Sequence, residues 1–331
     1  MKQRFKHLQV RSKSFRNRIV VPPMASQTAL NSGMASTKSF EHYQRLSLAK
    51  PALLIVEYSY VHSSGKSESN QMAIDQDEQI EGLKSISNLI KASGALSGIQ
   101  ITHSGSKSNS QIAGGRTLAP SEIAVPIKGE VLETPKAMNL FEIEQMKSWF
   151  LLAADRAVKA GFDLVEIHSA HGYGLNQWLS PITNHRQDCY GKNLAGRSLL
   201  LLEIVRSIRK AHPSLLLSVR MPGQDFLEGG LQIDDSIQIA QFLKDAGVDI
   251  LHISSGIGGW RRPNDRVGEG YLVDEAKAIA SHVALPVIGV GGIQTANYID
   301  DALEKKFFSF AAIGRAILND PFGWQNLQMS Q

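Results

Sequence analysis

The sequence predicts a single α/β domain folded as a (β/α)8 TIM barrel. Eight short runs rich in Val, Ile and Leu recur along the 331 residues. Each run is nearly continuous rather than alternating, which is typical of parallel strands covered on both faces. Segments with helical spacing separate the runs, and eight buried strands that alternate with helices favour a closed barrel over an open doubly wound sheet.

The predicted elements follow one another at regular intervals. The predicted strands occupy residues 18–24, 51–57, 96–101, 162–167, 214–220, 248–253, 285–290 and 309–314. The clearest helical periodicity spans residues 142–160, 200–211, 234–246 and 295–303. Two of these helices run directly into a glycine, Gly161 or Gly247, the residue preferred where a helix ends in the left-handed conformation.

The connection after the third strand is too long for an ordinary loop. Residues 102–140 begin as polar, glycine-rich sequence, and a connection of this length usually forms a lid or an extra hairpin. We therefore expect a lid or hairpin decorating the C-terminal mouth of the barrel. No repeat, low-complexity run or linker divides the chain, so residues 1–331 are predicted to form one domain.

Composition narrows the classes of partner. Lys and Arg outnumber Asp and Glu by 35 to 31, and much of the excess lies in residues 1–18. This basic start lacks the interleaved aromatic residues of a nucleic-acid-binding arm, so we interpret it as a solvated entry strand.

The only cysteine, Cys189, excludes internal disulfides and sites built on several thiolates. Because no run approaches the roughly 18 apolar residues of a membrane span and no secretory signal is visible, we expect a cytoplasmic protein.

The residues that follow each strand are the candidates for chemistry, since TIM-barrel active sites lie where the strands end. His168, His171 and Tyr173 come directly after the fourth run. The two imidazoles suit three roles, which are polarising one carbonyl oxygen, binding a metal, or packing. A catalytic zinc site normally needs a third protein ligand and none stands nearby in the sequence, so we predict no metal. Tyr173 offers a hydroxyl acid.

Two glycine-containing loops follow the last two strands. Gly291 and Gly292 come after the seventh run, and Gly314 and Arg315 come after the eighth. Loops in these places often present backbone N–H groups to a phosphate, and an arginine adds further donors. Each glycine alone would suit a tight turn, but the two loops together favour a phosphate site. The spacing does not fit the Gly-x-Gly-x-x-Gly pattern of a dinucleotide-binding fold.

Two more polar residues lie on the strands themselves. Arg220 ends the fifth run, and a buried guanidinium needs an anion, an electron-rich partner or a carboxylate on a neighbouring strand. Gln100 in the third run offers a donor and an acceptor together, as the edge of an imide-like ring requires. An ordinary core amide is the alternative for Gln100.

These residues resemble the old yellow enzyme family of FMN-dependent oxidoreductases. The most specific stretch is Glu166-Ile-His-Ser-Ala-His-Gly-Tyr-Gly-Leu-Asn-Gln-Trp-Leu-Ser-Pro-Ile-Thr-Asn184, supported by residues 17–24, 225–230, 246–256 and 313–316. The resemblance covers nearly the whole chain. It implies a bound FMN, NAD(P)H as a diffusible hydride donor, and reduction of an activated carbon–carbon double bond such as that of an α,β-unsaturated carbonyl.

The resemblance also implies a role for each candidate. His168 and His171 would hold the substrate carbonyl, and Tyr173 would protonate the α-carbon while flavin N5 delivers hydride to the β-carbon. The implied cofactor contacts are Pro23, Met24, Ala25, Tyr58, Gln100, Arg220, Gly291, Gly292, Gly314 and Arg315. The partners would be a small unsaturated substrate and a nicotinamide, with no nucleic acid or membrane, and a homo-oligomer is left open.

Three departures from the family pattern affect the flavin edge and the pocket mouth. Ala25 stands where the family usually has Thr or Cys facing flavin O4, which predicts a shifted flavin potential. Tyr58 takes the place of a small residue near the flavin, and Ser106 takes the place of an Arg. The alternative function is a pathway-specific flavin dehydrogenase or double-bond isomerase on the same fold. A barrel that binds flavin or phosphate without activity is a third hypothesis.

Overall fold

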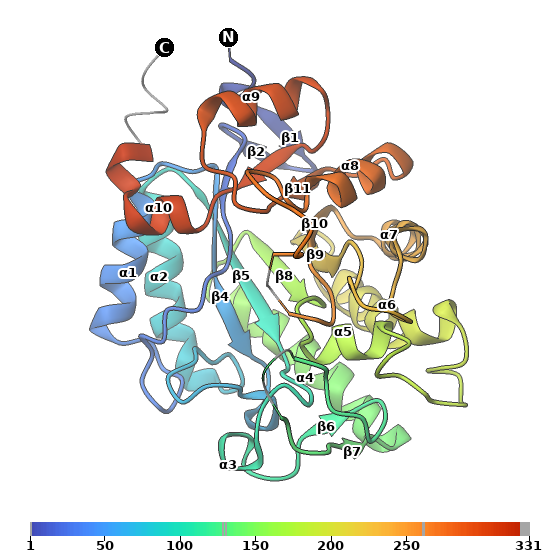
Figure 1. Cartoon of the computed structure of the whole chain (residues 1–331). Helices are drawn as coiled ribbons and strands as arrows, with labels where there is room; N and C mark the ends of the chain where they lie inside the picture. Colours follow the sequence, from blue (N-terminus) through green and yellow to red (C-terminus); the bar gives the residue numbers. More distant parts are fainter. Residues whose placement is uncertain (1, 128, 130, 260–261, 325–331) are drawn as a thin grey trace.

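The predicted barrel is confirmed. The computed structural model describes the chain except for residues 1, 128, 130, 260–261 and 325–331. Eight parallel strands close into a barrel in the order β10-β11-β12-β3-β4-β5-β8-β9 (Figure 1). They are β3 (Ile19–Val21), β4 (Leu53–Tyr60), β5 (Leu96–Thr102), β8 (Leu164–His168), β9 (Leu216–Pro222), β10 (Ile250–Ser254), β11 (Val287–Gly289) and β12 (Phe310–Ala312). Each overlaps one of the eight predicted runs.

Helices separate the strands and surround the barrel (Figure 1). They are α1 (Thr37–Ser47), α2 (Ile80–Ala92), α3 (Ser110–Ala113), α4 (Leu140–Lys159), α5 (Gly174–Leu179), α6 (Leu194–Ala211), α7 (Ile233–Ala246), α8 (Val273–His282), α9 (Ala296–Glu304) and α10 (Arg315–Asn319). Asn139 begins α4 with a reciprocal capping box to Glu142. Gly247 ends α7 at φ +101, as its place after the last helical turn predicts.

The basic N-terminus is a hairpin rather than a single strand and only part of it is solvated, which corrects the prediction. It forms an antiparallel hairpin of β1 (Leu8–Val10) and β2 (Lys13–Phe15). Phe15 is fully buried, and its ring lies 4.7 Å from that of Phe310 at the N-terminal end of the barrel. The arginines have structural partners: Arg16 donates to the carbonyls of Ser93 and Pro51. Those partners are distant in sequence, so charge pattern alone did not reveal them.

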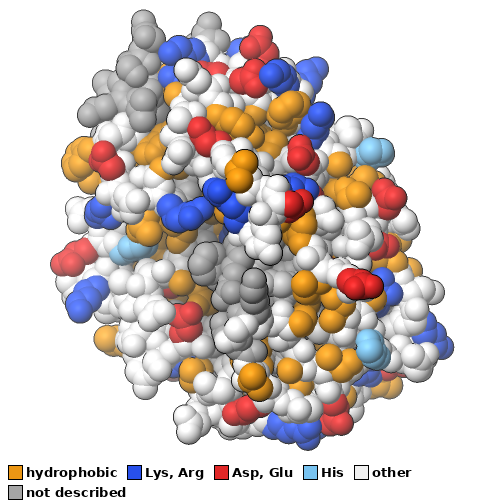
Figure 2. Space-filling view, viewed as in Figure 1, with side chains coloured by type: hydrophobic (Ala, Val, Ile, Leu, Met, Phe, Trp, Pro, Cys, Tyr) orange, Lys and Arg blue, Asp and Glu red, His pale blue; other side chains and the backbone are white. Residues whose placement is uncertain are grey.

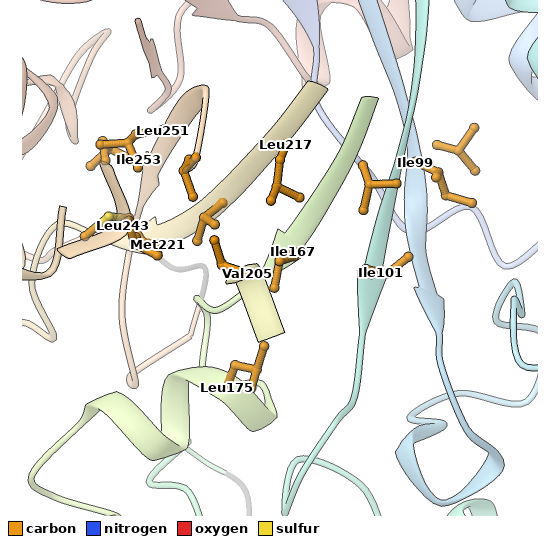
Figure 3. Close-up of a cluster of buried hydrophobic side chains, with 14 of the residues drawn as sticks. Ile99, Ile101, Ile167, Leu175, Val205, Leu217, Met221, Leu243, Leu251 and Ile253 are labelled. Atoms are coloured by element: carbon orange, nitrogen blue, oxygen red, sulfur yellow. The ribbon is translucent and has the colours of Figure 1, made fainter. Parts of the chain in front are cut away.

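The barrel strands divide their side chains between two environments. One set points outward and packs under the helices. Figure 3 labels strand residues of this cluster (Ile99, Ile101, Ile167, Leu217, Met221, Leu251 and Ile253) with the helix residues Leu175, Val205 and Leu243. The residues between them point into the barrel because strand side chains alternate. Near the strand C-termini these inward positions are polar, for example Glu166 and Arg220. The same alternation that builds the core therefore places polar groups at one mouth.

The long connection after β5 lies over that mouth, but it is not a hairpin. Its short strands β6 (Leu118–Ala119) and β7 (Lys136–Ala137) pair in parallel. Val125 and Ile127 pack with Ile257 from the loop after β10 in a small separate cluster. This packing ties the insertion to the opposite side of the mouth. Among the described residues, no helix combines the length and apolar character needed to cross a membrane.

Candidate active site

A sharp turn after β8 places two histidines and a tyrosine together. His171 adopts φ +60 and Gly172 φ +76, conformations that reverse the chain directly after the strand. The strained His171 backbone is held on both sides, because its N–H donates to the Ser255 carbonyl and its own carbonyl accepts from Lys107 Nζ at 2.8 Å. A Cβ on Gly172 would lie 2.8 Å from the Ile257 carbonyl oxygen. Only glycine therefore fits this turn without a shift.

The two imidazoles lie edge to face with ring centroids 5.1 Å apart. His171 Nε2 lies 2.6 Å from Ser254 Oγ at the end of β10. Burial, together with the nearby Arg220, holds the pKa of both histidines well below the usual value. Both rings are therefore neutral near pH 7, and each has one N–H to donate.

Tyr173 stands at the edge of the histidine pair. Its ring centroid lies 4.8 Å from His168 and 5.3 Å from Tyr58. Lys107 Nζ, from the insertion, lies 4.3 Å from the Tyr173 ring centroid. The phenol therefore has a cation above its ring and a second phenol beside it.

A buried carboxylate organises the polar interior beneath the histidines. Glu166 accepts hydrogen bonds from Gln100 Nε2 (2.9 Å) and Ser218 Oγ (3.0 Å), and lies 2.9 Å from His252 Nδ1. Burial alone would raise the pKa of Glu166, but His252 and Arg220 outweigh it and the pKa is lowered. Burial lowers the pKa of His252. We therefore treat Glu166 as ionised and His252 as neutral.

Arg220 lies in the same interior at the end of β9. It is 8% exposed, and its Nε has no hydrogen-bond partner in the part of the chain that the structure describes. Burial lowers its pKa while Glu166 opposes that effect, so the Glu166 charge compensates the guanidinium at a distance. A direct salt bridge, the structural alternative for Arg220, does not occur among the described residues: none of their carboxylates lies within the 4.0 Å ion-pair distance. The free N–H is thus available to another group.

The glycine loops after β11 and β12 form the other side of the mouth. Gly291 and Gly292 adopt φ +122 and +70, and a Cβ on Gly291 would lie 2.7 Å from the Leu272 backbone nitrogen. Tyr271 lies against this pair, and its hydroxyl accepts a hydrogen bond from Arg315 Nη2 at 3.4 Å. Figure 2 shows Lys and Arg side chains gathered in the centre of this face, close to α10. In these loops a ligand could therefore come close to the backbone beside positively charged side chains.

The loop after β3 completes the rim. Pro23 is buried, whereas Ala25 is exposed at the mouth. A Cβ on Gly314 would lie 3.1 Å from Met24 Sδ, so the loops after the first and last strands touch. Ser26 bonds through its N–H (3.0 Å) and hydroxyl to the buried Glu57 carboxylate. Glu57 therefore anchors the segment that carries Ala25.

The structure brings most of the predicted residues to one mouth of the barrel, together with three residues that the sequence did not single out. Ser254, Lys107 and Glu166 hold His171, Tyr173 and Gln100 in place, yet none was singled out. Ser254 follows the sixth strand, so the same rule of strand ends could have found it. Within the part of the chain that the structure describes, no group of three or more His, Cys, Asp or Glu side chains is placed to hold a metal ion.

Comparison with known proteins decides the family. The model of the NADH:flavin oxidoreductase / NADH oxidase family matches residues 3–330. This chain belongs to that family. It is 35% identical over 310 residues to an NADPH dehydrogenase of Bacillus pumilus, covering 93% of this chain and 89% of the relative. It is 33% identical over 319 residues to an NADPH dehydrogenase of Bacillus subtilis, covering 96% and 92%.

Solved structures agree on the fold. An old yellow enzyme homologue from Zymomonas mobilis superposes with a TM-score of 0.85 at 22% identity, covering 99% of this chain and 93% of that one. Morphinone reductase gives the same TM-score and identity, covering 99% and 90%. The resemblance to the old yellow enzyme family is thus confirmed. The chain is an NAD(P)H-dependent flavin oxidoreductase with FMN as its cofactor.

Proposed function

We propose that this chain is an ene-reductase that uses NAD(P)H to reduce an activated carbon–carbon double bond, as in an α,β-unsaturated carbonyl. The observation that carries the proposal is the arrangement of two neutral, buried imidazoles beside one phenol. Two N–H donors can hold a carbonyl oxygen, and the phenol can protonate the adjacent carbon.

The residues of the mouth fit FMN. The unpartnered Arg220 Nε–H and the Gln100 amide suit the pyrimidine edge, where negative charge accumulates on reduction. The backbone at Gly291 and Gly292, with Gly314 and Arg315, suits the phosphate. FMN held by these residues would supply the hydride chemistry that links the nicotinamide to the β-carbon of the alkene.

His168 and His171 act on the substrate oxygen. Because both imidazoles are neutral, they donate hydrogen bonds without bringing a positive charge that would repel Arg220. A preorganised donor of this kind stabilises a developing oxyanion by about 3 kcal/mol. Loss of either ring would therefore slow alkene reduction by about a hundredfold.

Tyr173 supplies the proton. Its hydroxyl gives a proton to the α-carbon as hydride reaches the β-carbon, and the phenolate that forms lies beside the Lys107 ammonium. The cation stabilises this charge without needing to move. Nicotinamide and alkene would use one pocket in turn, since both must meet the same atom of the cofactor.

The test is a spectroscopic titration without air. The purified holoenzyme should lose its yellow colour when NADPH is added, a donor chosen because the relatives are named NADPH dehydrogenases. Cyclohexenone should then restore the colour. Bleaching without reoxidation by the enone would contradict the proposal, and so would a His171→Ala variant that retained FMN and full alkene reduction.

A pathway-specific dehydrogenase or double-bond isomerase is the second candidate. The observation in its favour is Tyr58, which fills space beside Tyr173 with a large side chain. Such an enzyme would react slowly with NADPH and quickly with its own substrate. A yellow protein that neither NADH nor NADPH bleaches would favour this candidate.

A further inference from the structure

A bulge in strand β4 directs the Tyr58 side chain toward Tyr173. The pairing of β4 with β5 shifts register between Val56 and Ser59, so β4 carries one extra residue there. Such a bulge turns a side chain away from its regular direction. The Tyr58 carbonyl is fixed by a 3.0 Å hydrogen bond from Gln71 Nε2. The result is a ring that is 6% exposed and lies 5.3 Å, centroid to centroid, from Tyr173.

The surroundings keep Tyr58 protonated. Burial is the largest cause of a raised pKa, and the neighbouring Tyr173 and Glu68 raise the pKa further. Ser67 acts in the opposite direction and lowers the pKa of Tyr58, but burial outweighs it. Tyr58 therefore keeps its proton and can act as a hydrogen-bond donor.

The residue that fixes the Tyr58 backbone also fixes Ser67. The Ser67 N–H donates to Gln71 Oε1 at 2.8 Å, so one glutamine fixes both the Tyr58 backbone and the loop that carries Ser67.

We propose that Tyr58 is a positioning residue that donates its hydroxyl hydrogen to Tyr173 and stabilises the phenolate left when Tyr173 gives up its proton. The proposal rests on the acid role of Tyr173 in the proposed function. Lys107 lies above the Tyr173 ring and Tyr58 lies beside it, so the developing charge has two stabilising neighbours. In this step Tyr173 transfers one proton to the substrate, and Tyr58 transfers none.

The test uses Tyr58→Phe, which keeps the ring and removes the hydroxyl. Tyr60→Phe is the matched control, because Tyr60 lies on the same strand and its hydroxyl contacts the Ser32 carbonyl instead. Titration of ring-labelled tyrosine by NMR, with Tyr173 assigned through a Tyr173→Phe variant, reports directly on the acid. We expect Tyr58→Phe to move the Tyr173 midpoint upward by about one pH unit and Tyr60→Phe to leave it in place. An unchanged midpoint in Tyr58→Phe overturns the proposal.

Stopped-flow kinetics then separate this inference from the proposed function. Tyr58→Phe should slow reoxidation of the reduced holoenzyme by cyclohexenone on the order of tenfold. Bleaching by NADPH and reoxidation by ferricyanide need no proton from Tyr173 and should change less than twofold. A wild-type protein that cyclohexenone does not reoxidise contradicts the proposed function. If Tyr58→Phe is as fast as wild type and Tyr58→Ala gains activity on bulky enones, Tyr58 only limits the size of the substrate. That result overturns the proposal.

Discussion

Removing the Ser254 hydroxyl should weaken the site through His171 alone. Ser254 Oγ lies 2.6 Å from His171 Nε2, and the two residues are 2% and 7% exposed. A buried hydrogen bond contributes about 1 kcal/mol, and its loss costs about 1–3 kcal/mol when the remaining buried partner is left unsatisfied. The hydroxyl also fixes which His171 ring nitrogen carries the proton. Its removal should therefore also weaken the hydrogen bond from His171 to the substrate.

We therefore expect Ser254→Ala to retain FMN, to lose about 1–2 kcal/mol of unfolding free energy, and to reduce enone at roughly a tenth of the wild-type rate. The matched control is Ser255→Ala, whose buried hydroxyl has no hydrogen-bond partner among the described residues. Urea unfolding and the rate of reoxidation by cyclohexenone give the two quantities. If Ser254→Ala and Ser255→Ala agree within twofold in rate, the hydroxyl does not orient His171.

Three further changes have defined outcomes. Arg220→Met should lower the flavin midpoint potential, by about 30 mV for each ~1.4 kcal/mol of lost charge stabilisation, measured by dye equilibration; an unchanged potential would place the guanidinium away from the cofactor. Gly291→Ala, whose Cβ would meet the Leu272 nitrogen at 2.7 Å, should lower FMN retention on dialysis and the melting temperature, whereas Gly115→Ala, with open space around its Cβ, should not. Burial lowers the pKa of His103 to about 3, against about 6.5 when unfolded, so the unfolded chain binds a proton that the folded chain does not. The free energy of unfolding should therefore fall as pH drops below about 6.5, and less steeply in His103→Asn; equal slopes in urea titrations from pH 7 to 5 would contradict this.

The fold could be predicted because its signals are local. Continuous Val, Ile and Leu runs mark strands covered on both faces, and Gly247 marks the end of a helix. The connection between β5 and α4 was predicted as a lid or hairpin from its length. Its parallel pairing depends on strands of two residues each, too short to leave a pattern in the sequence.

Part of the site could also be predicted, because some of its residues are neighbours in the sequence. His168, His171 and Tyr173 lie within six residues of one another, so one turn brings them together. Ser254 reaches His171 only because β10 lies two strands from β8 in the closed barrel. The direction of the Tyr58 side chain depends on a strand bulge. Such features follow from register between distant segments, which composition and spacing do not contain.

The central claim is that this chain delivers hydride to one alkene carbon and a proton, through Tyr173, to the other. The most direct measurement is one turnover of the NADPH-reduced holoenzyme with cyclohexenone in D2O, followed by NMR of the product. We expect cyclohexanone that carries solvent deuterium at the α-carbon, and a much slower turnover in Tyr173→Phe. Unreacted enone, or cyclohexanone without deuterium at the α-carbon, would contradict this role of Tyr173.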